Sequence, residues 1–420
     1  MDASALAFTT VFCALLVAGL LVRAYLAGRQ MRHVARHRDQ VPAPFNHTIG
    51  LDAHRKAADY TIAKTRFGLL ETAFEAAVLV GWTLMGGLDW LNQTLLVSMG
   101  PGLWQQLTLV ACFAVIGGLV GLPFAWYATF RLEARFGFNK MGLSLWLVDG
   151  LKGAVIGAVI GLPVLALVLW LMGTAGPTWW LWAWGVWMGF NLLALVLYPT
   201  LIAPLFNKFE PLTDDTIRAR VNALMARCGF SAQGLFVMDG SKRSAHANAY
   251  FTGFGAAKRV VFFDTLLNQL SPDEIDAVLA HELGHYRRRH ILKRIVMLFG
   301  LSLLGFAALG WASSQAWFFI GLGVQPSLQA PNDALALILF VLTVPLLTYF
   351  LSPLMAQISR RHEFEADAFA MEKTRGSDLA SALLKLYQDN ASTVTPDPLY
   401  ASFYYSHPPA SERLARLQTA

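Results

Sequence analysis

Residues 281 to 290 of this 420-residue chain read His-Glu-Leu-Gly-His-Tyr-Arg-Arg-Arg-His and carry the side chains best suited to chemistry. On a helix, His281 and His285 stand four residues apart and lie on one face. Two imidazoles placed in this way can both bind one Zn²⁺, at about 2.0–2.1 Å each. Glu282 lies beside them, where its carboxylate can take a proton from a water at the metal. The spacing therefore predicts part of a catalytic zinc site with Glu282 as its general base.

The residues before this motif favour the helix that it requires. Ser271 suits the N-cap, and Pro272 suits the first helical position. Carboxylates follow in the first turn, where the helix dipole favours negative charge, at Asp273 and Glu274. Apolar residues then recur at helical spacing, at Ile275, Val278 and Leu279.

A catalytic zinc has three protein ligands and one open position, so a third ligand must come from elsewhere in the chain. Glu363 and Asp367 are four residues apart and share a helical face. This spacing lets Glu363 bind the metal while Asp367 accepts a hydrogen bond from the outer nitrogen of a zinc histidine. Glu365 points away from that face and is predicted to be solvated, and His362 lies off the face.

His290 is predicted to lie outside the metal site. It follows His285 by five residues, which places it roughly 140° around a continuous helix. With the three arginines at 287–289 it is expected at the membrane interface, where arginine side chains contact phospholipid headgroups.

The composition predicts a polytopic membrane protein. The chain is 55% hydrophobic and only 14% charged, with a mean hydropathy of +0.47, whereas soluble domains average about 25% charged residues. A helix needs roughly 20 residues to cross a bilayer. Seven apolar stretches are about this long or longer, at about 4–22, 68–97, 104–130, 145–174, 178–203, 294–321 and 333–356. The net charge of +6 does not indicate a nucleic-acid partner, because the basic residues cluster beside the spans.

These stretches divide the chain into two parts. Residues 1–205 form an N-terminal membrane domain with five spans, and residues 206–420 form a second domain that spans six and seven interrupt. The second domain is more polar and contains strand-like runs at Gly234–Met238 and Arg259–Phe263. The basic loop 23–67 predicts that the N-terminus lies outside, with the second domain and the C-terminus in the cytoplasm.

Two pairs of ionisable residues near the span starts leave alternatives open. Glu71 and Glu75 either line a chamber inside the membrane or lie in the first turns of a span, where the helix dipole favours anions. Asp149 and Lys152 have the same two interpretations and could pair with each other.

Four motifs in this order resemble the integral-membrane zinc metallopeptidases of the CAAX prenyl protease 1 family. They are H-E-L-G-H at 281–285, S-R-R-H-E-F-E-A-D at 359–367, N-A-Y-F-T-G at 248–253 and S-H-P-P at 406–409. Segments 207–212 and 262–267 are also similar, so the resemblance covers nearly the whole chain. It implies a mainly α fold in which seven transmembrane helices enclose a chamber, capped by a helical zinc-metallopeptidase domain with a small β-sheet.

The resemblance also implies a role for individual residues. It assigns one Zn²⁺ per chain to His281, His285 and Glu363, and the general base to Glu282. Asn248 and Ala249 match an edge-strand motif that aligns the substrate backbone, although Asn248 alone would suggest a turn. His407 matches a histidine that stabilises the oxyanion or orients the substrate, although it also fits a helix start. Arg413 matches an arginine near the site and is assigned to substrate binding.

Three functions follow as hypotheses. The first is a zinc metalloendopeptidase that cleaves prenylated CAAX-type or other hydrophobic membrane-associated substrates through a zinc-activated water. The second is a quality-control protease for damaged membrane proteins, and the third is a transporter or receptor with a structural zinc. Glu282 argues against the third, because a structural site needs no base and closes with four protein ligands. The expected partners are a peptide or protein substrate, lipidated or not, and membrane lipids.

The expected location is a bacterial inner membrane. The spans are rich in alanine, leucine and glycine, and the last residues, Leu-Ala-Arg-Leu-Gln-Thr-Ala, lack the lysine-rich retention signal of many eukaryotic members of this family.

Overall fold

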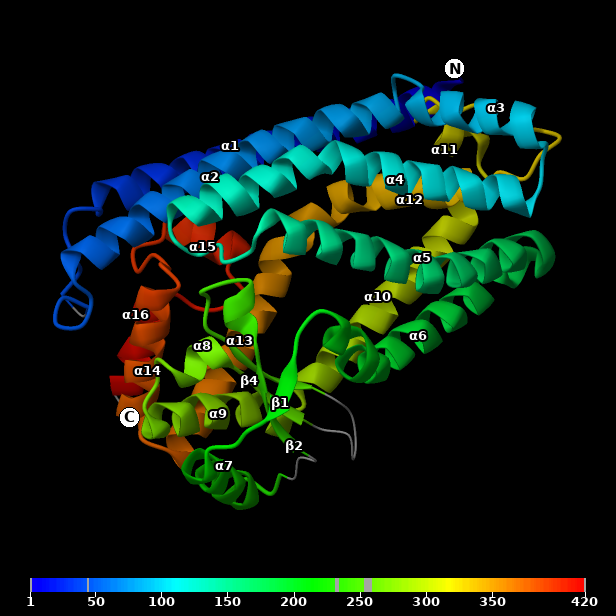
Figure 1. Ribbon diagram of the computed structural model, residues 1–420. Coiled ribbons are helices and arrows are strands. Elements are labelled where there is room, and N and C mark those ends of the chain that lie inside the picture. The colour runs from blue at the N-terminus through cyan, green and yellow to red at the C-terminus, as the bar shows by residue number, and fades with distance from the viewer. Residues whose placement is uncertain (1, 44, 231–233, 253–258, 419–420) are drawn as a thin grey trace.

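The computed structural model of the protein describes residues 2–43, 45–230, 234–252 and 259–418. Long helices fill the upper part of Figure 1, and one small sheet gathers with shorter helices at the lower left. The mainly helical fold with a small sheet is thus confirmed. Gly253, the last residue of the predicted N-A-Y-F-T-G segment, lies outside the described residues.

The described part of the chain has six helical segments long and apolar enough to cross a membrane, and a seventh if one bent pair counts as a single span. The bent pair, α2 and α3, turns by 46° between its two helices, so the predicted span 68–97 is not one straight helix. The long helices and α3 are α1 (Ala3–Arg36), α2 (Leu51–Trp82), α3 (Gly87–Met99), α4 (Leu103–Tyr127), α5 (Leu143–Thr174), α6 (Trp179–Leu197), α10 (His290–Ala312) and α12 (Asp333–Thr348).

The sixth span ends earlier than predicted. Helix α10 stops at Ala312, not near residue 321, and a separate short helix, α11 (Ala316–Ile320), follows. The hydroxyls of Ser313 and Ser314 donate to carbonyls of the last helical turn, at Gly310 and Trp311. The apolar residues of α11 continue the hydropathy of the span, which explains why the sequence did not reveal this end.

The long helices form a ring of contacts in which α12 also packs on α4 and α5. Helix α1 packs on α2, and α2 reaches α4 through the rings of Phe74 and Phe124, whose centroids lie 4.6 Å apart. The ring continues through α5, α6, α10 and α12 and returns to α1. Next to α1 and α2 lie two neighbouring cavities of about 620 and 300 Å³, and both are lined by Arg23 and Thr72.

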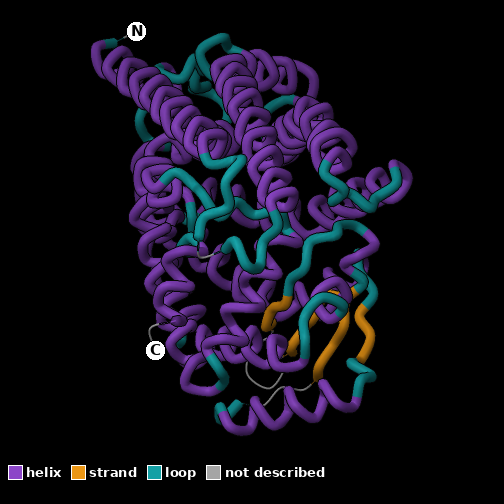
Figure 2. Tube along the Cα trace, turned by 90° about the vertical axis from the view of Figure 1, so that its left-hand side faces the viewer, coloured by secondary structure: helices purple, strands orange, loops and turns teal. Residues whose placement is uncertain are grey.

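The sheet has four strands in the order β1-β2-β4-β3. They are β1 (Phe209–Pro211), β2 (Gly234–Met238), β3 (Ala249–Thr252) and β4 (Arg259–Phe263), drawn in orange in Figure 2. Strands β2 and β4 pair in parallel, whereas β1 and β3 pair antiparallel with their neighbours. The predicted strands β2 and β4 are confirmed at their predicted residues, and β3 lies at an edge of the sheet.

Together with this sheet, the following helices make up what we call the polar domain: α7 (Asp215–Arg227), α8 (Asp264–Leu267), α9 (Pro272–Arg287), α13 (Ser352–Lys373), α14 (Gly376–Asp389), α15 (Pro398–Tyr404) and α16 (Ala410–Gln418). The start of α9 is as predicted. Ser271 accepts a hydrogen bond from the backbone of Glu274, whose carboxylate accepts one from the backbone of Ser271. Phe262 of the sheet and Ile275 and Leu279 of α9 are fully buried in one core.

Helices α12 and α13 carry the chain out of the membrane. Helix α12, the short 3-10 helix Tyr349–Leu351 and α13 form the helical segment Asp333–Lys373 of 41 residues, about twice the roughly 20 residues needed to cross a bilayer. Its apolar part lies at the N-terminal end, so Glu363 and Asp367 on α13 lie outside the hydrocarbon.

Of the two ionisable pairs considered above, Asp149 and Lys152 have other partners than each other, whereas Glu75 lines a cavity. Asp149 accepts a hydrogen bond of 2.9 Å from Nε of Arg243 in the polar domain, and Lys152 donates to the carbonyl oxygen of Leu205. Asp149 and Lys152 therefore tie α5 to other segments and do not pair with each other. Glu75 lines the smaller cavity, which supports the chamber interpretation for this residue.

Candidate metal centre

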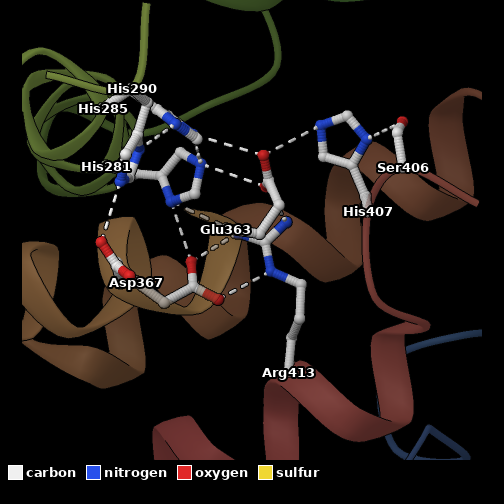
Figure 3. A network of polar contacts seen from close by, with 9 residues as sticks. His281, His285, His290, Glu363, Asp367, Ser406, His407 and Arg413 are labelled. Atoms are coloured by element: carbon white, nitrogen blue, oxygen red, sulfur yellow. Dashed lines mark hydrogen bonds and ion pairs between the residues drawn. The ribbon is translucent and has the colours of Figure 1, made fainter. Parts of the chain in front are cut away.

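The centre forms where α9 crosses α13. Gly284, inside the His-Glu-Leu-Gly-His motif, faces Ala366 of α13, and a Cβ atom at position 284 would meet the Ala366 backbone. Since the glycine has no side chain, the two helices approach closely. This contact brings the face of α9 with His281 and His285 against the face of α13 with Glu363 and Asp367 (Figure 3).

His281, His285 and Glu363 converge on one point. Each offers one ligand atom, and these atoms all lie within 4.8 Å of one another. The two Nε2 atoms are 3.2 Å apart. The carboxylate of Glu363 lies 3.5 Å from Nε2 of His281 and 3.3 Å from Nε2 of His285. Two imidazoles and one carboxylate are a donor set of catalytic zinc sites.

The carboxylate of Glu363 fits a metal better than it fits its protein neighbours. The residue is buried, and among the described residues its Oε2 atom has no hydrogen-bond partner. A buried carboxylate oxygen without a partner is costly, and a bound cation would remove that cost. The donor set and this oxygen together fit the metal that the motif predicts.

Asp367 and Arg413 support His281 from behind. Asp367 accepts a hydrogen bond of 2.8 Å from Nδ1 of His281, which leaves the lone pair of Nε2 directed at the centre. Arg413 binds both oxygens of Asp367, with Nε at 2.8 Å from Oδ2. Its Nη1 also lies 3.7 Å from Oε2 of Glu363. Because Arg413 is buried and engaged in these contacts, its side chain faces the inner side of the centre.

The charges of the centre depend on one another. Burial lowers the pKa of His281, but the hydrogen bond to Asp367 and the contact with Glu363 outweigh burial and raise this pKa to about 9. Burial raises the pKa of Glu363, yet its contacts with His281 and His285 hold the pKa far below its usual range. A metal can bind Nε2 of His281 only when this nitrogen carries no proton, so metal binding and protonation compete there.

Glu282 and His407 are the two residues predicted to take part in catalysis. Glu282 follows His281 on α9 and is half-buried, and among the described residues its carboxylate makes no hydrogen bond or ion pair. His407 follows α15 and places Nε2 at 3.5 Å from Oε1 of Glu363, while its Nδ1 lies 3.0 Å from the hydroxyl of Ser406 (Figure 3). The side chain of His407 is 63% exposed, so it lies on the open side of the centre.

The prediction that His290 lies outside the site is wrong. Helix α9 ends at Arg287, Arg289 adopts a left-handed backbone conformation with φ of 55°, and α10 begins at His290. This break turns His290 back, so its Nδ1 lies 3.0 Å from Nδ1 of His285. The 140° argument assumed a continuous helix, and nothing in Arg-Arg-Arg signals a left-handed residue.

Glu365 and His362, which were not assigned to the site, surround His290. Nε2 of His290 lies 3.0 Å from Oε2 of Glu365, and the ring of His362 stacks on that of His290 at a centroid distance of 4.0 Å. The prediction that Glu365 is simply solvated is therefore wrong, although its side chain is 45% exposed. Burial lowers the pKa of His290, which favours its neutral form.

Asn248 and Ala249 lie at the sheet edge. Ala249 begins β3 and pairs with Phe262, and the carbonyl oxygen of Asn248 accepts a hydrogen bond from Phe263. The side-chain oxygen of Asn248 accepts a hydrogen bond from the backbone of Ala249. The two residues thus stand at the start of an edge strand, and among the described residues no strand pairs with its outer side.

The larger cavity links the polar domain to the membrane helices. Its wall in the polar domain includes His246, Tyr387, Asn390 and Tyr405, and its wall in the membrane domain includes Arg23, Tyr60, Lys64 and Thr72. The smaller cavity shares Arg23 and Thr72 with the larger one, and six of its fourteen lining residues are leucines, namely Leu15, Leu16, Leu20, Leu79, Leu342 and Leu346. The smaller cavity is therefore the more apolar of the two, although Arg23 and Glu75 also line it.

Two family models match the chain. Residues 30–208 match the N-terminal domain of CAAX prenyl proteases, described as five membrane helices, and residues 211–420 match peptidase family M48. Similar proteins include the CAAX prenyl protease 1 of Saccharomyces cerevisiae, 34% identical over 96% of this chain and 93% of the relative. The human CAAX prenyl protease 1 homolog is 30% identical over 94% of this chain and 92% of the relative.

A solved structure has the same fold. The crystal structure of S. mikatae Ste24p superimposes with a TM-score of 0.91 at 31% sequence identity, covering 98% of this chain and 99% of that chain. These similarities do not favour the quality-control protease or the transporter or receptor with a structural zinc.

Proposed function

This chain belongs to the CAAX prenyl protease 1 family of M48 peptidases and is a membrane zinc metalloprotease, and we propose that it cleaves prenylated CAAX-type or other hydrophobic membrane-associated substrates. The observation that carries the proposal is the convergence of His281, His285 and Glu363 beside Glu282. These three residues would hold one Zn²⁺ per chain. When bound there, zinc supplies an acidified water and polarises the carbonyl of the scissile bond.

Glu282 is the general base and acid in this proposal. Its carboxylate accepts a proton from the attacking water and delivers that proton to the nitrogen of the leaving amine. The lack of other partners for this carboxylate among the described residues supports the role, because no hydrogen bond must break before the proton is accepted.

Asp367 and His407 act on the two sides of the centre. Asp367 keeps the proton of His281 on Nδ1, and Arg413 holds Asp367 in that orientation. We therefore assign Arg413 to the support of Asp367 in preference to direct substrate binding. His407, on the open side, is placed to donate to the oxygen of the carbonyl under attack, where negative charge develops.

The edge strand β3 supports an extended substrate. An extended peptide can add to an exposed strand through backbone hydrogen bonds, and Asn248 and Ala249 stand at the start of this edge. We assign them to the alignment of the substrate backbone.

The more apolar lining of the smaller cavity supports a lipid-bearing substrate. We place an extended peptide in the larger cavity and an isoprenoid chain in the smaller, more apolar one. Burial of an apolar chain contributes about 0.8 kcal/mol per CH₂ group, so the lipid can dominate affinity over a short peptide. We further propose a bacterial inner membrane, with the metal centre on the cytoplasmic side.

The test compares a farnesylated peptide ending in C-a-a-X with the same peptide lacking the farnesyl group. We expect cleavage after the modified cysteine, much faster for the farnesylated peptide at equal concentration in detergent or liposomes. Glu282→Gln serves as the blank, since it should keep about one zinc per chain yet lose activity, and Glu363→Ala should lose both zinc and activity.

Equal rates for the two peptides would overturn the lipid-recognition part of the proposal and favour quality control of membrane proteins. Full zinc occupancy in Glu363→Ala would show that the third ligand is assigned wrongly.

A further inference from the structure

His285 is the only one of the three proposed ligands, among the described residues, whose outer ring nitrogen meets another imidazole. Its Nδ1 lies 3.0 Å from Nδ1 of His290, and Nε2 of His290 lies 3.0 Å from Oε2 of Glu365. His281 instead has Asp367 directly at its Nδ1. The two histidine ligands are thus supported in two different ways.

One assignment of protons satisfies the whole chain of contacts. If Nε2 of His285 is to bind a metal, its proton must lie on Nδ1 and point at Nδ1 of His290. Nδ1 of His290 must then accept, so its own proton lies on Nε2 and is donated to Glu365. Every nitrogen and the carboxylate oxygen then have a partner, and both imidazoles are neutral.

We propose that His290 and Glu365 form a positioning relay that fixes the tautomer and ring orientation of His285 for the metal. The residues come from both sides of the α9–α13 crossing: His290 begins α10, and Glu365 lies on α13 two residues after Glu363. The left-handed Arg289 is what returns His290 to His285. The relay ends at a carboxylate that is 45% exposed, so its outer end is open to solvent.

His285, His290 and Glu365 do not form a second metal site. Among the described residues, one cluster alone has ligand atoms close enough to hold a cation, and that cluster is His281, His285 and Glu363. The imidazole of His362 adds stacking, not ligation, because its ring lies almost parallel to that of His290, at an interplanar angle of 12°.

The test measures zinc affinity of the full-length protein in detergent, by competition with a chromophoric chelator, and the melting temperature of the metal-free protein. His290→Phe keeps the volume and the stacking on His362 but removes both hydrogen bonds, and we expect zinc affinity to fall about 10–100-fold. His290→Gln can accept from His285 and donate to Glu365, so it should recover most of that loss. The melting temperatures of both metal-free variants should stay close to that of the wild type.

Glu365 gives an independent pair of variants at an exposed position. Glu365→Ala should weaken zinc binding by about tenfold, whereas Glu365→Gln, whose amide oxygen still accepts from His290, should stay near the wild type. The matched control is Glu372→Ala, an exposed glutamate on the same helix, which should change nothing. The two Glu365 variants test the relay even if His290→Phe does not fold.

Wild-type zinc affinity in a folded His290→Phe, or equal losses in His290→Phe and His290→Gln, would overturn the relay. The inference rests on the zinc ligands of the proposed function and not on the substrate. Zinc retained by Glu363→Ala would signal failure of the ligand assignment, and the absence of farnesyl preference would leave the relay intact.

Discussion

Gly284 and Ala366 set the distance between the two helices of the metal centre: a Cβ atom at position 284 would lie 2.9 Å from Cα of Ala366 and 3.0 Å from its carbonyl oxygen. Both neighbours are backbone atoms, so no side-chain rotation can relieve the contact. Gly284 stands one residue before His285, and Ala366 stands one residue before Asp367. Any separation of the helices therefore moves the histidines of α9 away from the carboxylates of α13.

Gly284→Ala should damage the centre although it adds one methyl group. We expect a loss of stability of about 1–3 kcal/mol from overpacking, a weaker zinc site and lower peptidase activity. The control is Gly300→Ala on α10, where a Cβ atom meets nothing within 4 Å and where the change should be neutral or stabilising by about 0.5–1 kcal/mol. Melting temperature and zinc content measure both effects, and a Gly284→Ala protein with normal zinc content would contradict the helix-spacing argument.

Asp367 and Arg413 provide a second prediction. Asp367→Ala removes the acceptor for Nδ1 of His281 and should weaken zinc about 10–100-fold, whereas Asp367→Asn keeps an oxygen there and should lose less. Arg413→Ala leaves two buried carboxylates without their cation, which should cost about 3–5 kcal/mol of stability.

Kinetics of an Arg413 variant that still folds then separate the two roles of this residue. If Arg413 supports Asp367, as we expect, Arg413→Lys should lower the zinc affinity. A rise in KM with unchanged zinc affinity would instead restore the assignment of Arg413 to substrate binding.

The sequence predicted the parts of the centre that local spacing controls. His281 and His285, and Glu363 and Asp367, each lie four residues apart on one helix, and helical periodicity is a local property. The cap at Ser271 and the strands β2 and β4 were predictable for the same reason. The pairing of α9 with α13 depended on the chemical argument that a catalytic zinc needs a third ligand.

The wrong predictions concern features that local sequence patterns do not determine. The left-handed Arg289 brought His290 back to His285, and left-handed conformations of non-glycine residues have no dependable sequence signal. The end of α10 was hidden because α11 is also apolar. The partner of Asp149 is Arg243, which is 94 residues away, and such a distant pairing depends on how the two domains pack.

Glu274 should make the helix that carries the zinc histidines sensitive to acid. Its carboxylate accepts hydrogen bonds from Ser271, from Ser381 at 2.6 Å, and from Lys385 at 2.8 Å. Burial raises the pKa of Glu274, but these donors outweigh burial and hold the pKa below its ordinary value. The stabilisation is therefore present above the unfolded-state pKa of about 4.3 and is lost as the pH falls through the lower folded-state pKa.

Glu274→Gln should accordingly destabilise the protein by about 1–2 kcal/mol at neutral pH. The difference in melting temperature between this variant and the wild type should shrink as the pH is lowered below about 4. A constant difference from pH 7 to pH 3 would show that the charge of Glu274 does not matter.

Membrane orientation is testable with single cysteines in a variant without the native ones. A thiol reagent that cannot cross membranes should label cysteines placed at Gly176 or Gln325 from outside. It should not label those at Asp39, Asp239 or Asp389, because the basic loops beside the spans favour the cytoplasm. Labelling of position 239 from outside would reverse the predicted orientation of the metal centre.

The smaller cavity offers the most selective test of lipid recognition. Ala76 of α2 lines this cavity, and the neighbouring Ala77 is exposed. A phenylalanine at 76 adds a ring to a space of about 300 Å³, so Ala76→Phe should raise KM for the farnesylated peptide about tenfold or more, a loss of roughly 1.4 kcal/mol of binding. Cleavage of the unprenylated peptide should change little.

Ala77→Phe is the matched control, since it adds the same ring one residue away on the exposed face. It should leave both KM values and the melting temperature near those of the wild type. If Ala76→Phe slowed both peptides equally, the ring would be disturbing the helix or the centre. If it slowed neither, the isoprenoid would lie elsewhere, and the leucine-lined cavity would have no part in substrate choice.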